Sequence, residues 1–194
     1  SENSLELFLD PAARKEADAL LKKALQGEQV PVIGLNPGAS YGPAKCWPAR
    51  KYAQLARNLL RQSGGLVVVF GTKTDRMAAA EIIAAAGERV LDLTGKTTLA
   101  QASACIARCS VFVTNDSGLM HVAAALDTPL VAVFGSTDHI ATGPYSEKAS
   151  IVRRPADCSP CMKTHCPKGH FQCMEGITVQ EVEQAVLRWL ERKK

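Results

Sequence analysis

Five short apolar runs recur along the first two thirds of the chain, each rich in Val, Leu, Ile or Phe. Polar and apolar residues show no regular alternation within them, unlike in a strand with one face in water. Continuous apolar runs are typical of strands in a parallel sheet that is covered on both faces. We therefore predict a buried parallel sheet, with strands at residues 30–35, 66–70, 90–93, 111–114 and 130–134.

Segments with helical character separate these runs. A strand followed by a helix, several times over, is the pattern of the α/β class. We therefore predict a Rossmann-like parallel sheet with helices on both faces. The predicted helices run from residue 48 to about 61, from 76 to 86, from a cap at Thr97 or Thr98 to about 107, and over 122–126.

Two further helices are expected outside this alternation. Asp10 is a suitable N-cap for a helix that ends near Gly27, and Thr178 with Glu181 predicts the capping box of a last amphipathic helix. We divide the chain into a helical extension and one Rossmann-like domain that contains a Cys-rich loop and the C-terminal helix. The ranges are 1–28 for the extension, 29–194 for the domain, 157–174 for the loop and 178–192 for the helix.

Small, hydroxyl-bearing or charged residues follow each predicted strand. The carboxyl ends of parallel strands meet at one edge of the sheet, where the ligands of open α/β proteins bind, so a nucleotide-type ligand is the default hypothesis. The first strand is not followed by the Gly-x-Gly-x-x-Gly of an NAD-binding domain, and no Gly-Lys-Ser/Thr ends its loop. A dehydrogenase and a Walker-type NTPase are therefore both disfavoured.

The stretch 114–121, Thr-Asn-Asp-Ser-Gly-Leu-Met-His, has the densest chemistry of these loops. It joins the fourth strand to a helix, whose free N–H groups favour an anion, and Asn115, Asp116 or Ser117 is suited to cap that helix. His121 follows Ser117 by four residues and is expected one turn further on the same side. The simpler interpretation is an N-cap followed by a partly buried His. A carboxylate, a hydroxyl, a Gly and an imidazole together favour a ligand site.

A second candidate loop, 36–48, is rich in Gly and Pro and leads into the helix that begins at Pro48. Small residues allow backbone N–H groups to approach phosphate oxygens, while Ser40 adds a hydroxyl and Lys45 a positive charge. The alternative is a plain connecting loop with a solvated Lys45.

The composition narrows the function classes. Hydrophobic residues make up 46% and charged residues 22%, which is ordinary for a globular protein, and the net charge of +4 suits an anionic ligand or an anionic membrane surface. Aromatic residues make up only 5%, which argues against a platform for single-stranded nucleic acid, so we expect no nucleic-acid partner. We find no apolar run long enough to span a membrane and no secretory signal, and therefore expect a cytoplasmic location.

Four Cys and two His crowd into residues 158–173. Cys158 and Cys161 have the spacing that lets two thiolates bind one tetrahedral metal ion, and Cys166 and Cys173 are candidates for a second pair. The wider spacing of that second pair is not the one found in a standard zinc ribbon. Three alternatives stay open: a structural zinc, reduced thiols that simply pack, and a disulfide formed on oxidation. The odd total of seven Cys favours reduced thiols.

Three motifs together resemble the ADP-heptose–lipopolysaccharide heptosyltransferases II, which belong to glycosyltransferase family 9. They are the loop 38–48, the stretch 114–121 and the Cys segment with Gly169-His170, and the resemblance covers residues 30–190. It implies the carboxyl-terminal, donor-binding domain of a GT-B glycosyltransferase. Such enzymes transfer heptose from ADP-heptose to the lipopolysaccharide inner core with inversion. The resemblance also implies that the chemistry requires no metal or other cofactor.

The resemblance implies roles for individual residues as well. Lys45 is expected near the donor phosphates, where it stabilises the departing charge and acts as the catalytic residue of this domain. Asp116 is expected to hold heptose hydroxyls. The other expected substrate-binding residues are Ser40 and Tyr41 at the phosphates, Ser117, Gly118 and His121 beside the diphosphate, and Thr94 and Gly95 at the adenosine.

In this family the acceptor domain and the catalytic base belong to an amino-terminal half that we do not find in this chain. We therefore expect the chain to bind ADP-heptose without transferring heptose by itself. The lipopolysaccharide core acceptor would be bound by the missing domain, peripherally at the cytoplasmic face of the inner membrane. Three alternatives remain open: a GT-B domain that uses a UDP-sugar, a metal-dependent interaction module built on the Cys segment, and a structural fragment that folds but binds nothing.

Overall fold

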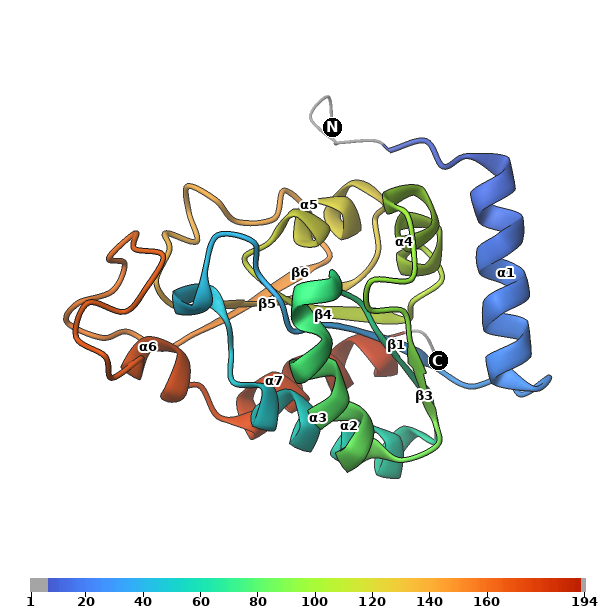
Figure 1. The fold of residues 1–194 in the computed structure, drawn as a ribbon, viewed down its shortest axis with the longest axis horizontal. Coiled ribbons are helices and arrows are strands. Elements are labelled where there is room, and N and C mark those ends of the chain that lie inside the picture. The colour runs from blue at the N-terminus through green and yellow to red at the C-terminus, as the bar shows by residue number, and fades with distance from the viewer. Residues whose placement is uncertain (1–6, 193–194) are drawn as a thin grey trace.

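A six-stranded sheet forms the centre of the computed structural model, which describes residues 7–192 (Figure 1). The strand order is β3-β2-β1-β4-β5-β6, and every neighbouring pair is parallel. The direction of chain progression reverses between β1 and β4, so the connections after these two strands leave in opposite directions and open a crevice at their carboxyl ends. The strands are β1 (Val32–Asn36), β2 (Leu66–Val69), β3 (Val90–Asp92), β4 (Val111–Asn115), β5 (Leu130–Phe134) and β6 (Ala149–Arg153).

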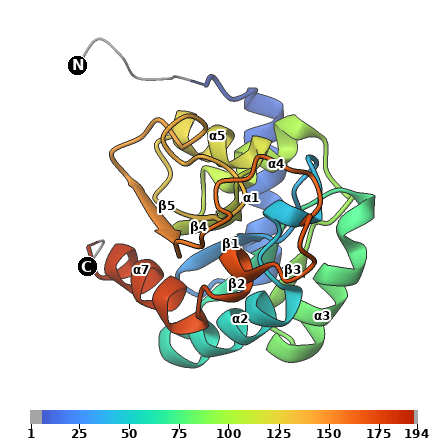
Figure 2. The same cartoon turned by 90° about the vertical axis from the view of Figure 1, so that its left-hand side faces the viewer.

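Helices cover both faces of the sheet, as Figures 1 and 2 show. Val67 and Val69 point into the core on one face, and Leu66 and Val68 into the core on the other. Both faces are buried, which explains why the strands carry no polar alternation and confirms the predicted fold class. One face holds α2 (Ala49–Ser63), α3 (Arg76–Ala86) and α7 (Val179–Glu191), and the other holds α1 (Pro11–Leu25), α4 (Leu99–Ile106) and α5 (Gly118–Ala125).

Several helices begin at the N-cap residues that the sequence predicts. The Asp10 side chain accepts a backbone N–H at the start of α1. Thr98 and Thr178 form capping boxes with Gln101 and Glu181 at the starts of α4 and α7. These side chains satisfy N–H groups that a first helical turn leaves without partners. Within residues 7–192, no helix is both long enough and apolar enough to cross a membrane.

Helix α1 packs on the same face as α4. Ala13, Ala17 and Leu21 are buried there, and an ion pair between Arg108 and Asp18, 2.6 Å apart, joins α1 to the turn that follows α4. The helix therefore forms part of the layer that covers this face of the sheet. The division of the chain into an extension and a domain at residue 28 stays a prediction.

The structure adds a sixth strand, β6, to the five that the sequence predicts. It lies at the edge of the sheet, where only β5 pairs with it, and its residues are partly buried or exposed. Trp189 of α7 donates its Nε1–H to Ser150 Oγ at 3.0 Å and fixes the helix against this edge. The prediction missed β6 because a half-exposed edge strand has no continuous apolar run. It also missed the short helix α6 (Gln172–Glu175).

Candidate functional site

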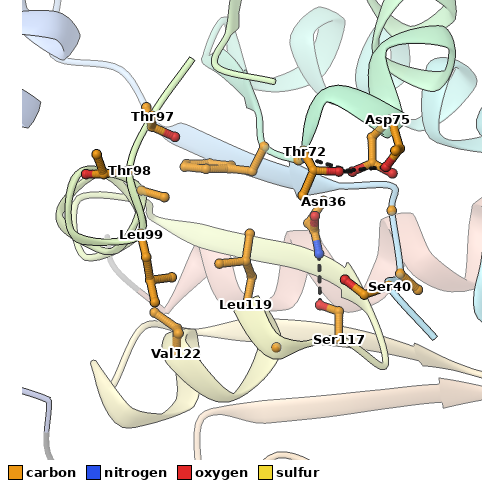
Figure 3. Close-up of a pocket in the computed structure, with 17 residues that line it drawn as sticks. Asn36, Ser40, Thr72, Asp75, Thr97, Thr98, Leu99, Ser117, Leu119 and Val122 are labelled. Carbon is orange, nitrogen blue, oxygen red and sulfur yellow. Dashed lines mark hydrogen bonds between the residues drawn. The ribbon is translucent and has the colours of Figure 1, made fainter. Parts of the chain in front are cut away.

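A pocket of about 370 Å³ lies at the carboxyl ends of β1, β2 and β4 (Figure 3). Asn36 and Thr72 line it from the strand ends, Leu99 from α4, and Leu119 and Val122 from α5. Its volume falls in the range of roughly 300–1,000 Å³ that is usual for small-molecule sites. Apolar side chains on the helices and polar groups on the loops suit a nucleoside, which has flat apolar faces and polar edges.

The carboxylate of Asp75 forms one wall of this pocket. Its Oδ2 accepts hydrogen bonds from the Thr72 N–H at 2.7 Å and the Thr72 hydroxyl at 2.9 Å, which fixes its orientation. The backbone of Gly38 approaches so closely that a Cβ at this position would lie 2.3 Å from Asp75 Oδ1. A larger residue at position 38 would therefore displace the Asp75 carboxylate. The close packing of the loops after β1 and β2 requires glycine at this point.

Buried polar side chains join β1 and β4 at their carboxyl ends. We call Asn36, Thr114, Asn115 and Ser117 the strand-end network. Asn36 Nδ2 donates to Thr114 Oγ1 at 3.0 Å and to Ser117 Oγ at 2.9 Å, and Thr114 donates its only hydroxyl proton to the Asn115 carbonyl at 2.8 Å. The Ser117 hydroxyl, 3.0 Å from Thr114 Oγ1, is therefore left as a donor that can turn toward a ligand.

Asn115 links this network to α2 and to the loop after β1. Its Oδ1 accepts hydrogen bonds from the Trp47 N–H at 3.0 Å and the Tyr52 hydroxyl at 3.1 Å, and its Nδ2 donates to the Pro37 carbonyl at 2.7 Å. Burial raises the pKa of the Tyr52 phenol well above its ordinary value, so the group remains a neutral donor. These contacts hold both ends of the loop 37–47.

Lys45 and Asp116 form a buried ion pair on the other side of the β4 turn. The Lys45 Nζ lies 2.6 Å from Asp116 Oδ2, and the two side chains are only 12% and 6% exposed. The Thr142 hydroxyl is within hydrogen-bond distance of the same oxygen, at 3.2 Å, and the Tyr41 ring lies 4.5 Å from the ammonium. Asp116 does not line the pocket, although Ser117, the next residue, does. The site therefore has two compartments, one on each side of this turn.

The structure brings together six of the nine predicted substrate-binding residues and leaves three apart. Thr94 and Gly95 lie on the loop after β3, where Gly95 packs against Lys73, and His121 is exposed on α5. None of these three lines the pocket, and their predicted roles stay predictions. The six are Ser40, Ser117 and Gly118, which line the pocket, and Tyr41, Lys45 and Asp116, which form the charged compartment.

Sequence reasoning missed several residues of the site, among them Asn36 and Thr142 as well as Thr72, Leu99 and Val122 of the pocket lining. Asn36 ends the first apolar run, and a polar residue at that place could have been recognised from the pattern alone. Thr142 contacts Asp116 from a position 26 residues away, on a loop without regular periodicity, and no sequence signal points to it.

A second, much smaller cavity of about 10 Å³ lies in the Cys-rich segment, residues 157–174. Cys158, Cys161, Cys166 and Cys173 all line it, together with His170, and all four cysteines are free thiols. As the side chains stand, no three His, Cys, Asp or Glu residues within 7–192 form a group ready to hold a metal ion.

The six-stranded parallel sheet with helices on both faces matches the fold of GT-B glycosyltransferases. The solved structure of E. coli ADP-heptose lps heptosyltransferase II superposes with a TM-score of 0.81 and 36% identity, over 97% of this chain and 54% of that chain. A glycosyl transferase family 9 structure from Veillonella parvula superposes with a TM-score of 0.86 and 27% identity, over 99% and 55%.

Residues 2–172 match the model of glycosyltransferase family 9 (heptosyltransferase), and the chain belongs to this family. It is 45% identical over 156 residues to lipopolysaccharide heptosyltransferase 2 of Salmonella typhimurium, and 38% identical over 159 residues to lipooligosaccharide heptosyltransferase 2 of Campylobacter jejuni. These alignments cover 78% and 79% of this chain but 44% and 50% of those proteins. The chain thus spans about half the length of these relatives, and the predicted family is confirmed.

Proposed function

We propose that this domain binds ADP-heptose and is the donor-binding part of an inverting heptosyltransferase that extends the lipopolysaccharide inner core. The observation that carries this proposal is the Lys45–Asp116 pair beside the Ser117 turn, next to a nucleoside-sized pocket. The nucleoside occupies the pocket, the diphosphate crosses the turn, and the heptose reaches Asp116.

Charge complementarity supports this orientation of the donor. Phosphate oxygens need hydrogen-bond donors and positive charge, which the first N–H groups of α5, the Ser117 hydroxyl and the Lys45 ammonium supply. The Asp116 carboxylate repels a phosphate but accepts hydrogen bonds from sugar hydroxyls, so it suits the heptose end. The 2.6 Å contact between Lys45 and Asp116 puts the positive charge where phosphate and sugar meet.

The same arrangement supports catalysis when the bond between heptose and phosphate breaks. Negative charge then grows on the β-phosphate of ADP. Donors and dipoles that already face this position stabilise the charge without reorganising, and this is a large contribution to catalysis in many enzymes. Lys45 and the amino end of α5 fill this role in the proposed complex, while Asp116 keeps the heptose in place.

We further propose that the catalytic base and the acceptor site lie in the half of the relatives that this chain does not span. The chain alone is then expected to bind donor without transferring heptose. The lipopolysaccharide core is the expected acceptor, and the cytoplasmic face of the inner membrane the expected location. Robust heptose transfer by the isolated chain would contradict this part of the proposal.

Titration calorimetry with ADP-heptose, ADP and UDP tests donor binding. We expect ADP-heptose and ADP to bind and UDP to bind at least about tenfold more weakly. Lys45→Met should weaken both adenine ligands about tenfold, because a hydrogen bond to a charged group contributes roughly 1.5–3 kcal/mol. Asp116→Asn should weaken ADP-heptose but not ADP, and Lys23→Met, on the exposed end of α1, serves as the matched control.

Each part of the proposal has an outcome that contradicts it. Equal affinity for UDP and ADP would favour the alternative of a UDP-sugar domain. If none of the three ligands binds, the proposal that this domain binds a nucleotide-sugar donor is wrong. An equal loss of ADP and ADP-heptose affinity in Asp116→Asn would place Asp116 at the nucleotide instead of the sugar.

A further inference from the structure

The Cys-rich segment is not used by the proposed function, although it contains four of the seven cysteines. It forms the orange to red loop beside α6 in Figure 1. Its side chains are mostly exposed, and the two buried ones, Cys173 and Met174, lie at its end. A segment with so little buried apolar surface needs another source of stability to keep one conformation.

All four thiols of this segment border the same small cavity. They come from positions spread over sixteen residues, yet all four line the same cavity of about 10 Å³. This volume is about that of one water-sized probe, which is too small for an organic ligand. The remaining lining residues are Ala44, Ser136, Pro167, His170 and Phe171.

The backbone around Cys166 is arranged for a thiolate. The Phe171 N–H donates to Cys166 Sγ at 3.4 Å, and the Gly169 N–H donates to the Cys166 carbonyl at 3.1 Å in a tight turn. Gly169 has φ +70°, a conformation that favours glycine. Backbone N–H groups aimed at a sulfur stabilise its negative charge, and the thiolate is the form that binds metals.

We propose that Cys158, Cys161, Cys166 and Cys173 bind one metal ion, zinc or iron, in a tetrahedral set of four thiolates. Both metals accept such a ligand set. Binding draws the sulfur atoms inward by side-chain rotation, and the protons of the thiols pass to solvent. His170 Nε2, 4.0 Å from Cys158 Sγ, lies beside this set and is not one of the four ligands. Four protein ligands leave no open position, so the ion is structural.

The bound ion would stabilise the segment against the loop that bears Lys45. The Thr164 carbonyl accepts the Ala44 N–H at 3.0 Å, and the Met162 carbonyl accepts the Tyr41 hydroxyl at 3.1 Å. Ala44 lines the Cys cavity, and Lys45, the next residue, pairs with Asp116. This consequence for the donor site rests on the proposed function, whereas the metal site itself does not.

Metal analysis of the full chain, purified under anaerobic conditions without a metal-affinity tag, tests the proposal. We expect zinc and iron to sum to one ion per chain. Cys161→Ser should retain less than about a tenth of this amount. Cys46→Ser, which changes a thiol outside the cavity, and His170→Ala should both retain it.

A second measurement keeps the test independent of the folding of the variants. The metal-free wild-type chain is titrated with Co²⁺ and followed by absorption. Intense d–d bands of tetrahedral cobalt with sulfur-to-cobalt charge transfer, saturating at one ion per chain, are expected.

Three results would overturn the proposal: absence of both metals together with no such cobalt spectrum, full metal retention by Cys161→Ser, or a disulfide among the four cysteines of the anaerobic protein. A chain that binds the metal but no nucleotide would contradict only the proposed function.

Discussion

The strand-end network and the Cys-rich segment both hold loops beside the candidate site, and they do so in different ways. In the network, mostly buried side chains at the ends of β1 and β4 donate hydrogen bonds to one another and to nearby backbone carbonyls, with partners 2.7–3.4 Å apart. In the Cys-rich segment, exposed side chains and half-buried thiols surround a small cavity. The first arrangement is held by protein atoms alone, whereas we propose that a metal ion completes the second. Damage to the network should therefore affect the whole domain, and damage to the segment only its surroundings.

The largest effect is expected from Asn115→Ala. This change leaves the Trp47 N–H and the Pro37 carbonyl without their partner in a buried environment, and it removes one acceptor of the Tyr52 hydroxyl. Each buried polar group left unpaired costs roughly 1–3 kcal/mol, so we expect the free energy of unfolding to fall by about 4 kcal/mol. Urea denaturation measures this loss. Tyr52→Phe, which removes one hydroxyl and keeps the ring, should cost only about 1 kcal/mol, and equal effects of the two changes would contradict the role of Asn115.

Removal of the proposed metal should have a large local and a small global effect. Lys163 and Lys168 are exposed trypsin sites inside the segment. With a chelator, we expect cleavage after them to become at least about tenfold faster, which corresponds to roughly 1.4 kcal/mol of easier local opening. Cleavage after Lys22 on α1 is the internal control and should not change. Unchanged cleavage at Lys163 and Lys168, or a collapse of the whole urea transition, would contradict the comparison.

Thr142→Val tests the contact between the charged compartment and the loop after β5. The Thr142 hydroxyl lies 3.2 Å from Asp116 Oδ2 and orients the carboxylate that we place at the heptose. The same hydroxyl also lies 3.0 Å from the Asp138 carbonyl, so its single proton is shared between two acceptors. Its loss should weaken ADP-heptose about fivefold, or roughly 1 kcal/mol, and leave ADP unchanged. Calorimetry with both ligands measures the difference. Thr142→Ser retains the hydroxyl and should bind as the wild type does; a loss in this variant as well would point to packing instead.

The smallest effect concerns the base of the Cys-rich segment, where Arg154 precedes it and Glu181 follows it. The Thr178 hydroxyl and then Arg154, at 2.8 Å, lower the pKa of the Glu181 carboxyl from 4.5 to about 2. Because the folded pKa is the lower one, the stabilisation is complete above pH 4.5 and disappears as the pH falls toward 2. The pair is partly exposed and screened, so we expect a loss below about 1 kcal/mol.

Denaturation of the metal-free chain between pH 4.5 and 2 checks this prediction, because thiolate protonation then makes no contribution. Glu181→Gln should flatten the pH dependence in that window. Glu147→Gln, at an exposed loop position, should follow the wild type. If the free energy of unfolding of Glu181→Gln still falls with pH as steeply as that of the wild type, another group causes the acid sensitivity.

Much of the fold could be predicted from sequence, because every residue of a buried strand such as β2 or β5 is apolar. Strand β6 could not, because an edge strand takes its conformation from β5 and α7 instead of from its own apolar content. Ser117 and Gly118 were predictable because residues that directly follow parallel strands must meet at one edge. The pairing of Lys45 with Asp116 was not, since 71 residues separate them and their contact depends on a loop that Asn115 holds.

The division of the site at the Ser117 turn has a consequence for how the proposed donor is selected and released. In the complex that we propose, a nucleoside monophosphate would reach only the pocket, and a free sugar phosphate only the Lys45–Asp116 side. A molecule in which a diphosphate joins a nucleoside to a sugar would gain both sets of contacts at once, so selection would depend on reach as much as on the identity of either end. When the bond to the sugar breaks in this complex, ADP keeps the pocket and the turn but loses the heptose contacts with Asp116, and the heptose loses every contact that the diphosphate made. The two sets of contacts then act on separate molecules, so the cleavage that the site promotes also weakens its hold on each product.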